Sequence, residues 1–333
     1  ERMGTSVTNF FIRDLYTVDN GQIKNPIYVF SHKRLNSVFG TVDFSFNEFL
    51  FLNLTGRNDW FSTLNPASNS AFYPSGSTSF VFSQIWKSKP SWLDFGKIRA
   101  SYAEVGGDTD PYTNALYYNI ENNLFNGLPL GIITSAISPN ANLRPLTVKE
   151  TELGIDFKLF NNRLAVDIAA YNKITEDEIL NVDISNASGY GQTLVNVGKL
   201  RNRGIEASIS ITPIKNEHIK WESVINYAYN KTKVLQLADN QTRFDVGTGE
   251  YIGIVSHEVG LPMASLRGVD YLRNADGEII TSNGLFLPGN IVTYGSAIPP
   301  HTGGWLNTLT YKGVRFFVQV EFKAGHKMNS KSK

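Results

Sequence analysis

Apolar and polar side chains alternate with a period of two along much of this 333-residue chain. The pattern is clean in residues 41–47 (TVDFSFN), 152–159 (ELGIDFKL) and 205–212 (IEASISIT). Successive side chains of a β-strand point to opposite faces of the sheet, so each segment is predicted to be a strand with one apolar and one polar face. We therefore predict an all-β fold.

The connections between the predicted strands alternate between short and long. Asn161-Asn162 and Lys312-Gly313 are predicted two-residue turns. The long connections cover residues 59–76, 106–149, 174–202, 232–250 and 273–302. This alternation is typical of a transmembrane antiparallel β-barrel, which has short periplasmic turns, long external loops and apolar side chains facing lipid. Phe157, Ile168 and Ile209 are then expected to face lipid.

We expect about 12–14 strands, and a count of about thirteen favours a fragment of a larger barrel, because single-chain bacterial barrels usually have an even number. A self-contained twelve-stranded barrel is the competing possibility. A soluble protein of two β-sandwiches also remains open, because its buried faces alternate too. Aromatic residues near the predicted strand ends favour the membrane barrel, where they form interfacial girdles. They are Trp60, Tyr73, Trp86, Trp92, Tyr102, Tyr171, Trp221 and Trp305.

Composition excludes several classes of function. The formal net charge is +1, so no overall field attracts nucleic acid. Cysteine is absent, which excludes disulfides and thiolate metal sites. No apolar run approaches the roughly 18 residues of a membrane-spanning helix.

We find no motif for catalysis, a metal or a cofactor. His257-Glu258 begins like a zinc-protease motif, but Leu261 stands where the second histidine is required. Asp108, Asp110 and Asn114 offer oxygen ligands for calcium, although a solvated loop explains them better.

An aromatic and amide-rich segment, residues 112–125 (YTNALYYNIENNLF), is the best candidate for a binding function. Tyrosine rings stack on sugars and pack against peptides, and asparagine amides supply both donors and acceptors. Packing against neighbouring loops or a partner protein is an equally good explanation. The candidate contact residues are Tyr112, Tyr117, Tyr118, Asn122 and Asn123.

Residues 196–206 (NVGKLRNRGIE) combine glycines, cations and a carboxylate just before a predicted strand. We interpret them as a strand entry in which Glu206 faces the polar side and pairs with Arg201 or Arg203. Arg57 and Asp59, two residues apart, are predicted to stabilise the base of another loop.

This segment resembles a signature of the SusC/RagA family of TonB-dependent outer-membrane transporters of Bacteroidetes. The signature N-x-G-x-x-x-N-x-G-x-E stands here as Asn196, Gly198, Asn202, Gly204 and Glu206. Further blocks agree in the expected order, and the resemblance covers roughly residues 5–327. They are residues 54–60 (LTGRNDW), 97–107 (KIRASYAEVGG), 143–152 (LRPLTVKETE), 303–313 (GGWLNTLTYKG) and 325–327 (GHK).

The resemblance implies a nutrient importer in the outer membrane of a Gram-negative bacterium. The family pairs a plug domain with a barrel of roughly 22 strands, so residues 1–333 are expected to be part of the barrel domain, with the plug, the signal sequence and the last strands absent from this chain. Its implied partners are a SusD-like surface lipoprotein that acts as a lid, the TonB complex and outer-membrane lipid. A dimer of SusC–SusD pairs is a further expectation.

The implied cargo is an oligosaccharide or an oligopeptide, and no enzymatic activity is implied. The same residues leave two alternatives open. One is a passive porin or an adhesin-type barrel, and the other is an enzyme housed in a barrel.

Overall fold

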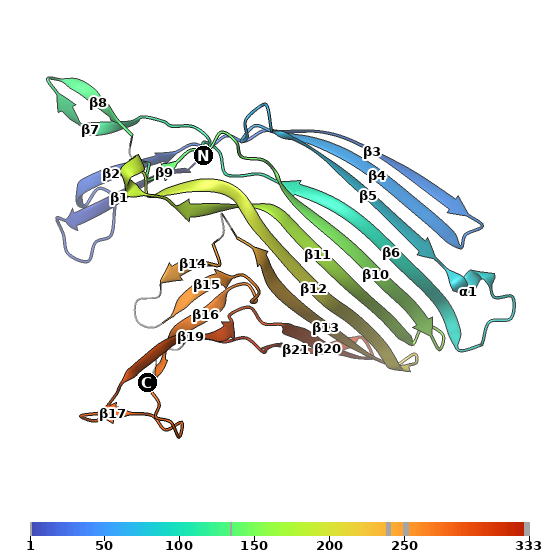
Figure 1. Cartoon of the computed structure of the whole chain (residues 1–333). Coiled ribbons are helices and arrows are strands. Elements are labelled where there is room, and N and C mark those ends of the chain that lie inside the picture. The colour runs from blue at the N-terminus through green and yellow to red at the C-terminus, as the bar shows by residue number, and fades with distance from the viewer. Residues whose placement is uncertain (1, 134, 238–240, 249–252, 330–333) are drawn as a thin grey trace.

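The computed structural model describes residues 2–133, 135–237, 241–248 and 253–329. One large antiparallel sheet dominates it and curves into an open trough (Figure 1). Each strand in the path pairs with the next one, and the order is β3, β4, β5, β6, β10, β11, β12, β13, β20, β21. Their bounds are β3 (Leu35–Phe46), β4 (Leu50–Phe61), β5 (Ser70–Phe80), β6 (Leu93–Gly107), β10 (Leu146–Leu159), β11 (Leu164–Asp183), β12 (Gln192–Lys215), β13 (Ile219–Gln236), β20 (His301–Tyr311) and β21 (Val314–Ala324).

With β9 (Ile137–Ser138), which pairs parallel to β12, the described part of the sheet has eleven strands. This is fewer than the sequence suggested, because the chain between β13 and β20 leaves the large sheet. It forms a separate four-stranded sheet, and between the last two strands of that sheet β17 (Thr281–Ser282) and β18 (Leu285–Phe286) pair as a two-stranded hairpin of their own. The four strands are β14 (Arg243–Thr248), β15 (Ile254–Glu258), β16 (Ser265–Tyr271) and β19 (Pro288–Ser296).

The predicted long loop at 174–202 is mostly strand. Strand β11 continues to Asp183 and β12 begins at Gln192, so a short connection with the 3-10 helix η1 (Asn186–Ser188) remains. Two hairpins project beyond this end of the sheet (Figure 1). They are β1 (Arg2–Phe10) with β2 (Gly21–Val29), and β7 (Asn119–Phe125) with β8 (Leu128–Ile132).

The short turns gather at the opposite end of the sheet (Figure 1). At the β10–β11 turn, Asn161 and Asn162 have φ of 57° and 58°, and at the β20–β21 turn Lys312 and Gly313 have φ of 45° and 87°. Tight hairpins need positive φ because their twist then matches that of the strands, and Asn and Gly adopt it most readily. The predicted two-residue turns are therefore confirmed. The β5–β6 connection at this end is longer and contains helix α1 (Phe82–Ile85).

The alternation seen in the sequence separates the two faces of the sheet. Phe157 lies opposite Val166, which lies opposite Ile209, and Ile168 belongs to the next row of the same face. The other face carries polar residues such as Asp156 and Asp167, which lie opposite each other. The predicted all-β architecture is confirmed, and the described sheet is open between β3 and β21.

The main cluster of buried apolar side chains lies at the long-loop end. Phe61, Leu64, Leu143 and Leu194 form a cluster that joins β4, two connections and β12. Every residue of the edge strands β3 and β21 is exposed. Among the described residues, no helix combines the length and the apolar character needed to cross a membrane.

Candidate functional site

The polar face of the sheet encloses a hollow of about 580 Å³, bounded by β6, β10–β13, β20 and β21. We call it the polar hollow. Four carboxylates and two cations line it, so its wall is acidic, and hydroxyl, amide and some apolar groups make up the rest. The polar lining residues are Arg99, Glu152, Asp167, Glu206, Ser208, Asn226, Thr302, Gln319, Glu321 and Lys323.

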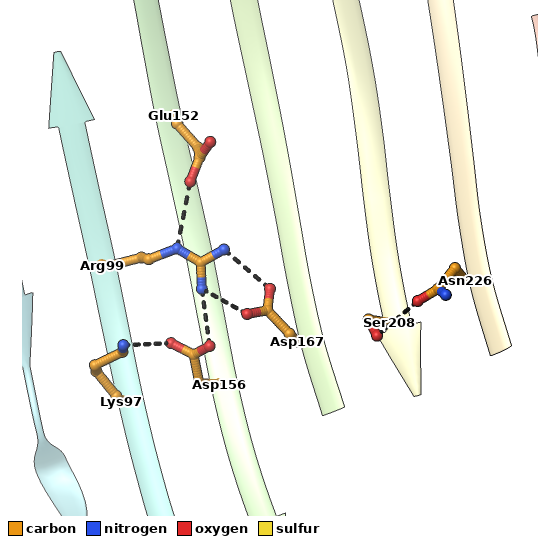
Figure 2. A network of polar contacts seen from close by, with 7 residues as sticks. All are labelled: Lys97, Arg99, Glu152, Asp156, Asp167, Ser208 and Asn226. Carbon is orange, nitrogen blue, oxygen red and sulfur yellow. Dashed lines mark hydrogen bonds and ion pairs between the residues drawn. The ribbon is translucent and has the colours of Figure 1, made fainter. Parts of the chain in front are cut away.

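Arg99 is the centre of an ion-pair network that crosses three strands (Figure 2). Its Nε donates to Glu152 at 3.3 Å, and its Nη1 donates to Asp156 at 2.9 Å. Both terminal nitrogens reach Asp167 on β11, at 3.2 and 2.9 Å. Lys97 adds a 3.0 Å ion pair to Asp156. A planar guanidinium suits this arrangement because its five donors form a rigid fork.

Gly154 makes the network possible. It lies opposite Arg99 in the register, and a Cβ at position 154 would lie 2.5 Å from the guanidinium. The arginine therefore crosses β10 through the space that a side chain would occupy, and so reaches Asp167 one strand further on. Sequence analysis missed this network, although the alternation places all five charged residues on polar faces.

Two strands further on, the polar wall continues with neutral groups. The Ser208 hydroxyl on β12 donates to the Asn226 side chain on β13 at 2.8 Å (Figure 2). Hydroxyl and amide groups accept and donate hydrogen bonds without a fixed charge.

The signature segment lies where β12 emerges from the loops. The Asn196 amide donates to the carbonyls of Arg144 and Asp177 at 2.7 and 2.9 Å, and its oxygen accepts from the Arg144 N–H at 2.8 Å. Asp177, with φ of 57°, sits at a bulge in β11. Asn196 thus satisfies the Asp177 carbonyl at the bulge and both backbone groups of Arg144, which lies in the connection before β10.

The signature glycines accept side chains from β11. Gly198 lies beside the Cβ of Glu178, and Gly204 lies under the ring of Tyr171, with which it is in register. A larger residue at either position would collide with these neighbours, at 2.6 and 2.5 Å. Glu206 lines the polar hollow, whereas the side chain of Asn202 makes no hydrogen bond to a described residue.

The expected pairing of Glu206 with Arg201 or Arg203 is wrong. Period-two alternation places positions 201 and 203 on the face opposite to Glu206, so their side chains cannot meet it. Arg203 instead donates to the Asn172 side chain at 2.8 Å.

Arg57 and Asp59 lie at the loop end of β4 and form an ion pair at 2.7 Å. Arg57 also donates to the Ser37 hydroxyl on β3 at 2.9 Å. The Asp59 side chain is only 8% exposed. Close by, Asp108 accepts hydrogen bonds from Lys33 and Thr63, so its two oxygens tie loops together.

The tyrosine candidates lie on an exposed connection outside the large sheet. Tyr112 and Tyr117 pack edge to face with ring centroids 5.6 Å apart, and the Tyr112 hydroxyl accepts from the His32 N–H at 3.0 Å. Tyr118 is 75% exposed. Asn122 and Asn123 belong to β7, and their side chains lie outside the described part of the structure. None of the three rings lines the polar hollow.

In the described part of the chain, no group of three or more His, Asp or Glu side chains is arranged to hold a metal ion. His257 has a structural contact instead, because its Nδ1 accepts from the Ala264 N–H at 3.1 Å.

A sheet with one apolar and one polar face, curved around an acidic hollow, is the wall of a transmembrane β-barrel. The chain belongs to the family described as TonB dependent receptor-like, beta-barrel, whose model matches residues 2–326. It is therefore a protein of the Gram-negative outer membrane, and the resemblance to SusC/RagA transporters is confirmed.

Individual relatives agree with this family. TonB-dependent receptor P26 of Formosa agariphila is 26% identical over 323 residues, which are 90% of this chain and 32% of that protein. TonB-dependent receptor SusC of Bacteroides thetaiotaomicron is 25% identical over 267 residues, covering 74% of this chain and 26% of SusC. The solved structure of the RagAB peptide transporter superimposes on this chain with a TM-score of 0.80 and 20% sequence identity. The match covers 94% of this chain and 35% of the transporter chain, so the two share the same fold. The chain spans about a third of the first relative's length.

Proposed function

We propose that this chain forms the wall and external loops of a TonB-dependent importer that takes up oligosaccharides or oligopeptides beneath a SusD-like lipoprotein lid. The observation that carries the proposal is the polar hollow on a sheet whose other face is apolar. Family membership supports an energised receptor, and the relatives named SusC and RagAB support a lid partner. No catalytic residue is assigned.

The open edges support the proposal that further strands complete the barrel. β3 and β21 have unpaired backbone groups along one side. In lipid such groups have no water to bind, so an open edge is not tolerated there. We propose that residues 1–333 are one part of a barrel domain in a longer protein that also carries a plug.

The neutral part of the wall supports an uncharged, hydrogen-bonding cargo. Ser208 and Asn226 offer such groups within the polar hollow. At the long-loop end, the packed pair Tyr112 and Tyr117 gives an aromatic surface suited to a sugar face, a peptide or the lid.

Uptake by the full-length receptor tests the proposal. Cells expressing it are given a fluorescent pool of oligosaccharides or of tryptic peptides, in strains with and without active TonB. We expect accumulation of one pool only, at least about tenfold lower without TonB. Equal uptake in both strains would indicate a passive porin and overturn the proposal. A parallel strain that lacks the proposed SusD-like lipoprotein tests the lid.

A further inference from the structure

Four cations form a compact group on the apolar side of the sheet, above the apolar rows. Arg203 on β12 lies directly opposite Lys231 on β13, and Arg201 lies directly opposite Lys233. Directly opposed residues of antiparallel strands point to the same face with Cβ atoms about 5 Å apart. We call these four residues the basic quartet.

The basic quartet is unfavourable for the fold by itself. Like charges directly opposite each other destabilise a strand pair, and here two such pairs are adjacent. Among the described residues, no carboxylate forms an ion pair with any of the four. The next cation on β12 differs, because Lys199 is paired with Glu176 at 2.6 Å. The basic quartet therefore lacks a carboxylate partner such as the one that Lys199 has.

The height of the basic quartet in the membrane follows from the residues below it. On β13 the outward positions from Trp221 to Tyr229 rise about 20 Å, at roughly 3.3 Å per residue and a tilt of about 40°, close to the apolar band of about 25 Å in such barrels. Tyr229 and His301 pack together at the upper end, with centroids 5.0 Å apart. An aromatic girdle marks the membrane interface, so the cations just above it lie at headgroup level.

We propose that the basic quartet binds the phosphate groups of a phosphorylated lipid in the outer leaflet. The leaflet follows from topology, because the quartet is at the long-loop end of β12 and β13, which faces the cell exterior. Arginine donates two parallel hydrogen bonds to a phosphate, and lysine adds point charges. Acyl chains of the same lipid lie along Ile205 and Ile209 directly below. Free phosphate lacks this apolar contact and binds more weakly.

The test compares two double variants of the full-length receptor in detergent. Arg203→Gln with Lys231→Gln removes two cations of the quartet. Lys215→Gln with Lys220→Gln removes an opposed cation pair from the same two strands at the short-turn end, and serves as the control. Binding of fluorescent phosphorylated lipid A, of its dephosphorylated form and of inorganic phosphate is measured for each.

We expect the quartet variant to bind phosphorylated lipid A about 20- to 30-fold more weakly, because each interfacial cation contributes about fivefold. The control variant and the charge-retaining variant Arg203→Lys with Lys231→Arg should bind within about twofold of the parent. Dephosphorylated lipid A should not distinguish the parent from the quartet variant.

A stability measurement separates lost binding from misfolding. Without phosphorylated lipid, the quartet variant should melt at the same temperature as the parent or higher, since like-charge repulsion is relieved. Equal lipid binding by both double variants would overturn the proposal. Tight binding of inorganic phosphate alone would also overturn it.

Discussion

Gly154 has the same role as two other glycines of the sheet, which is to leave room for a side chain from the neighbouring strand. Arg99 crosses β10 over Gly154, the Tyr171 ring covers Gly204, and the Phe322 ring covers Gly303. In each case the glycine and the large residue are a register pair. Glycine alone weakens a strand, and at these three positions the close approach of a large side chain explains its presence.

Replacing Gly154 with valine is expected to disrupt the Arg99 network. The new side chain would occupy the guanidinium position and separate Arg99 from Asp167, which should reduce the free energy of unfolding by about 1–3 kcal/mol. Urea unfolding of the full-length receptor in lipid measures the change.

Gly40→Val is the control, because a Cβ there meets nothing within 4 Å. An equal loss of stability in both variants would show that the backbone, rather than the network, accounts for the effect.

The separate sheet of β14, β15, β16 and β19 is an element with its own polar packing. Ser256 and Ser265 are fully buried, and the Ser265 hydroxyl donates to the Pro262 carbonyl at 2.7 Å. Beside them, burial lowers the pKa of His257 below its ordinary value of 6.5. The neutral ring fits the structure, since its Nδ1 accepts a hydrogen bond from the Ala264 backbone.

The lowered pKa of His257 predicts that this sheet loosens in acid. The unfolded chain takes up the proton more readily than the folded sheet, so the stabilisation is complete above pH 6.5 and is lost as the pH falls through the lowered pKa. Hydrogen exchange of residues 254–267 should therefore accelerate between pH 7.5 and pH 5, after correction for intrinsic rates. The His257→Gln variant should lack this pH dependence, and an unchanged profile in it would exclude His257 as the cause.

At the scale of the whole molecule, the two faces of the sheet meet different solvents. Ser208 lines the polar hollow, whereas its neighbour Ile209 lies on the opposite face with Val166. In a cysteine-free background, a fluorophore at Ile209→Cys should be quenched by nitroxide lipids in vesicles, and one at Ser208→Cys should not. Quenching at both positions, or at Ser208 alone, would contradict the barrel orientation.

The sequence alone determined the faces of the alternating strands and the tight turns of this protein, although not where β11 and β12 end at the loops. These are local properties. A period of two determines which face of the sheet a residue such as Ile168 occupies. Asn161 and Asn162 adopt positive φ readily, whichever strands the turn connects. The SusC/RagA signature could also be recognised in the sequence. The hydrogen bond from the Asn196 side chain to the Asp177 carbonyl at the β11 bulge could not be predicted from it.

Only the tertiary structure decided which distant segments lie together. β13 pairs with β20 although a second sheet intervenes, Arg99 reaches Asp167, and two pairs of cations face each other across β12 and β13. Strand alternation does not predict these pairings, because the register of a strand and the strands it pairs with depend on contacts between residues far apart in sequence. The tyrosines at 112, 117 and 118 lie away from the polar hollow for the same reason: their place depends on where the loop folds, not on their own pattern.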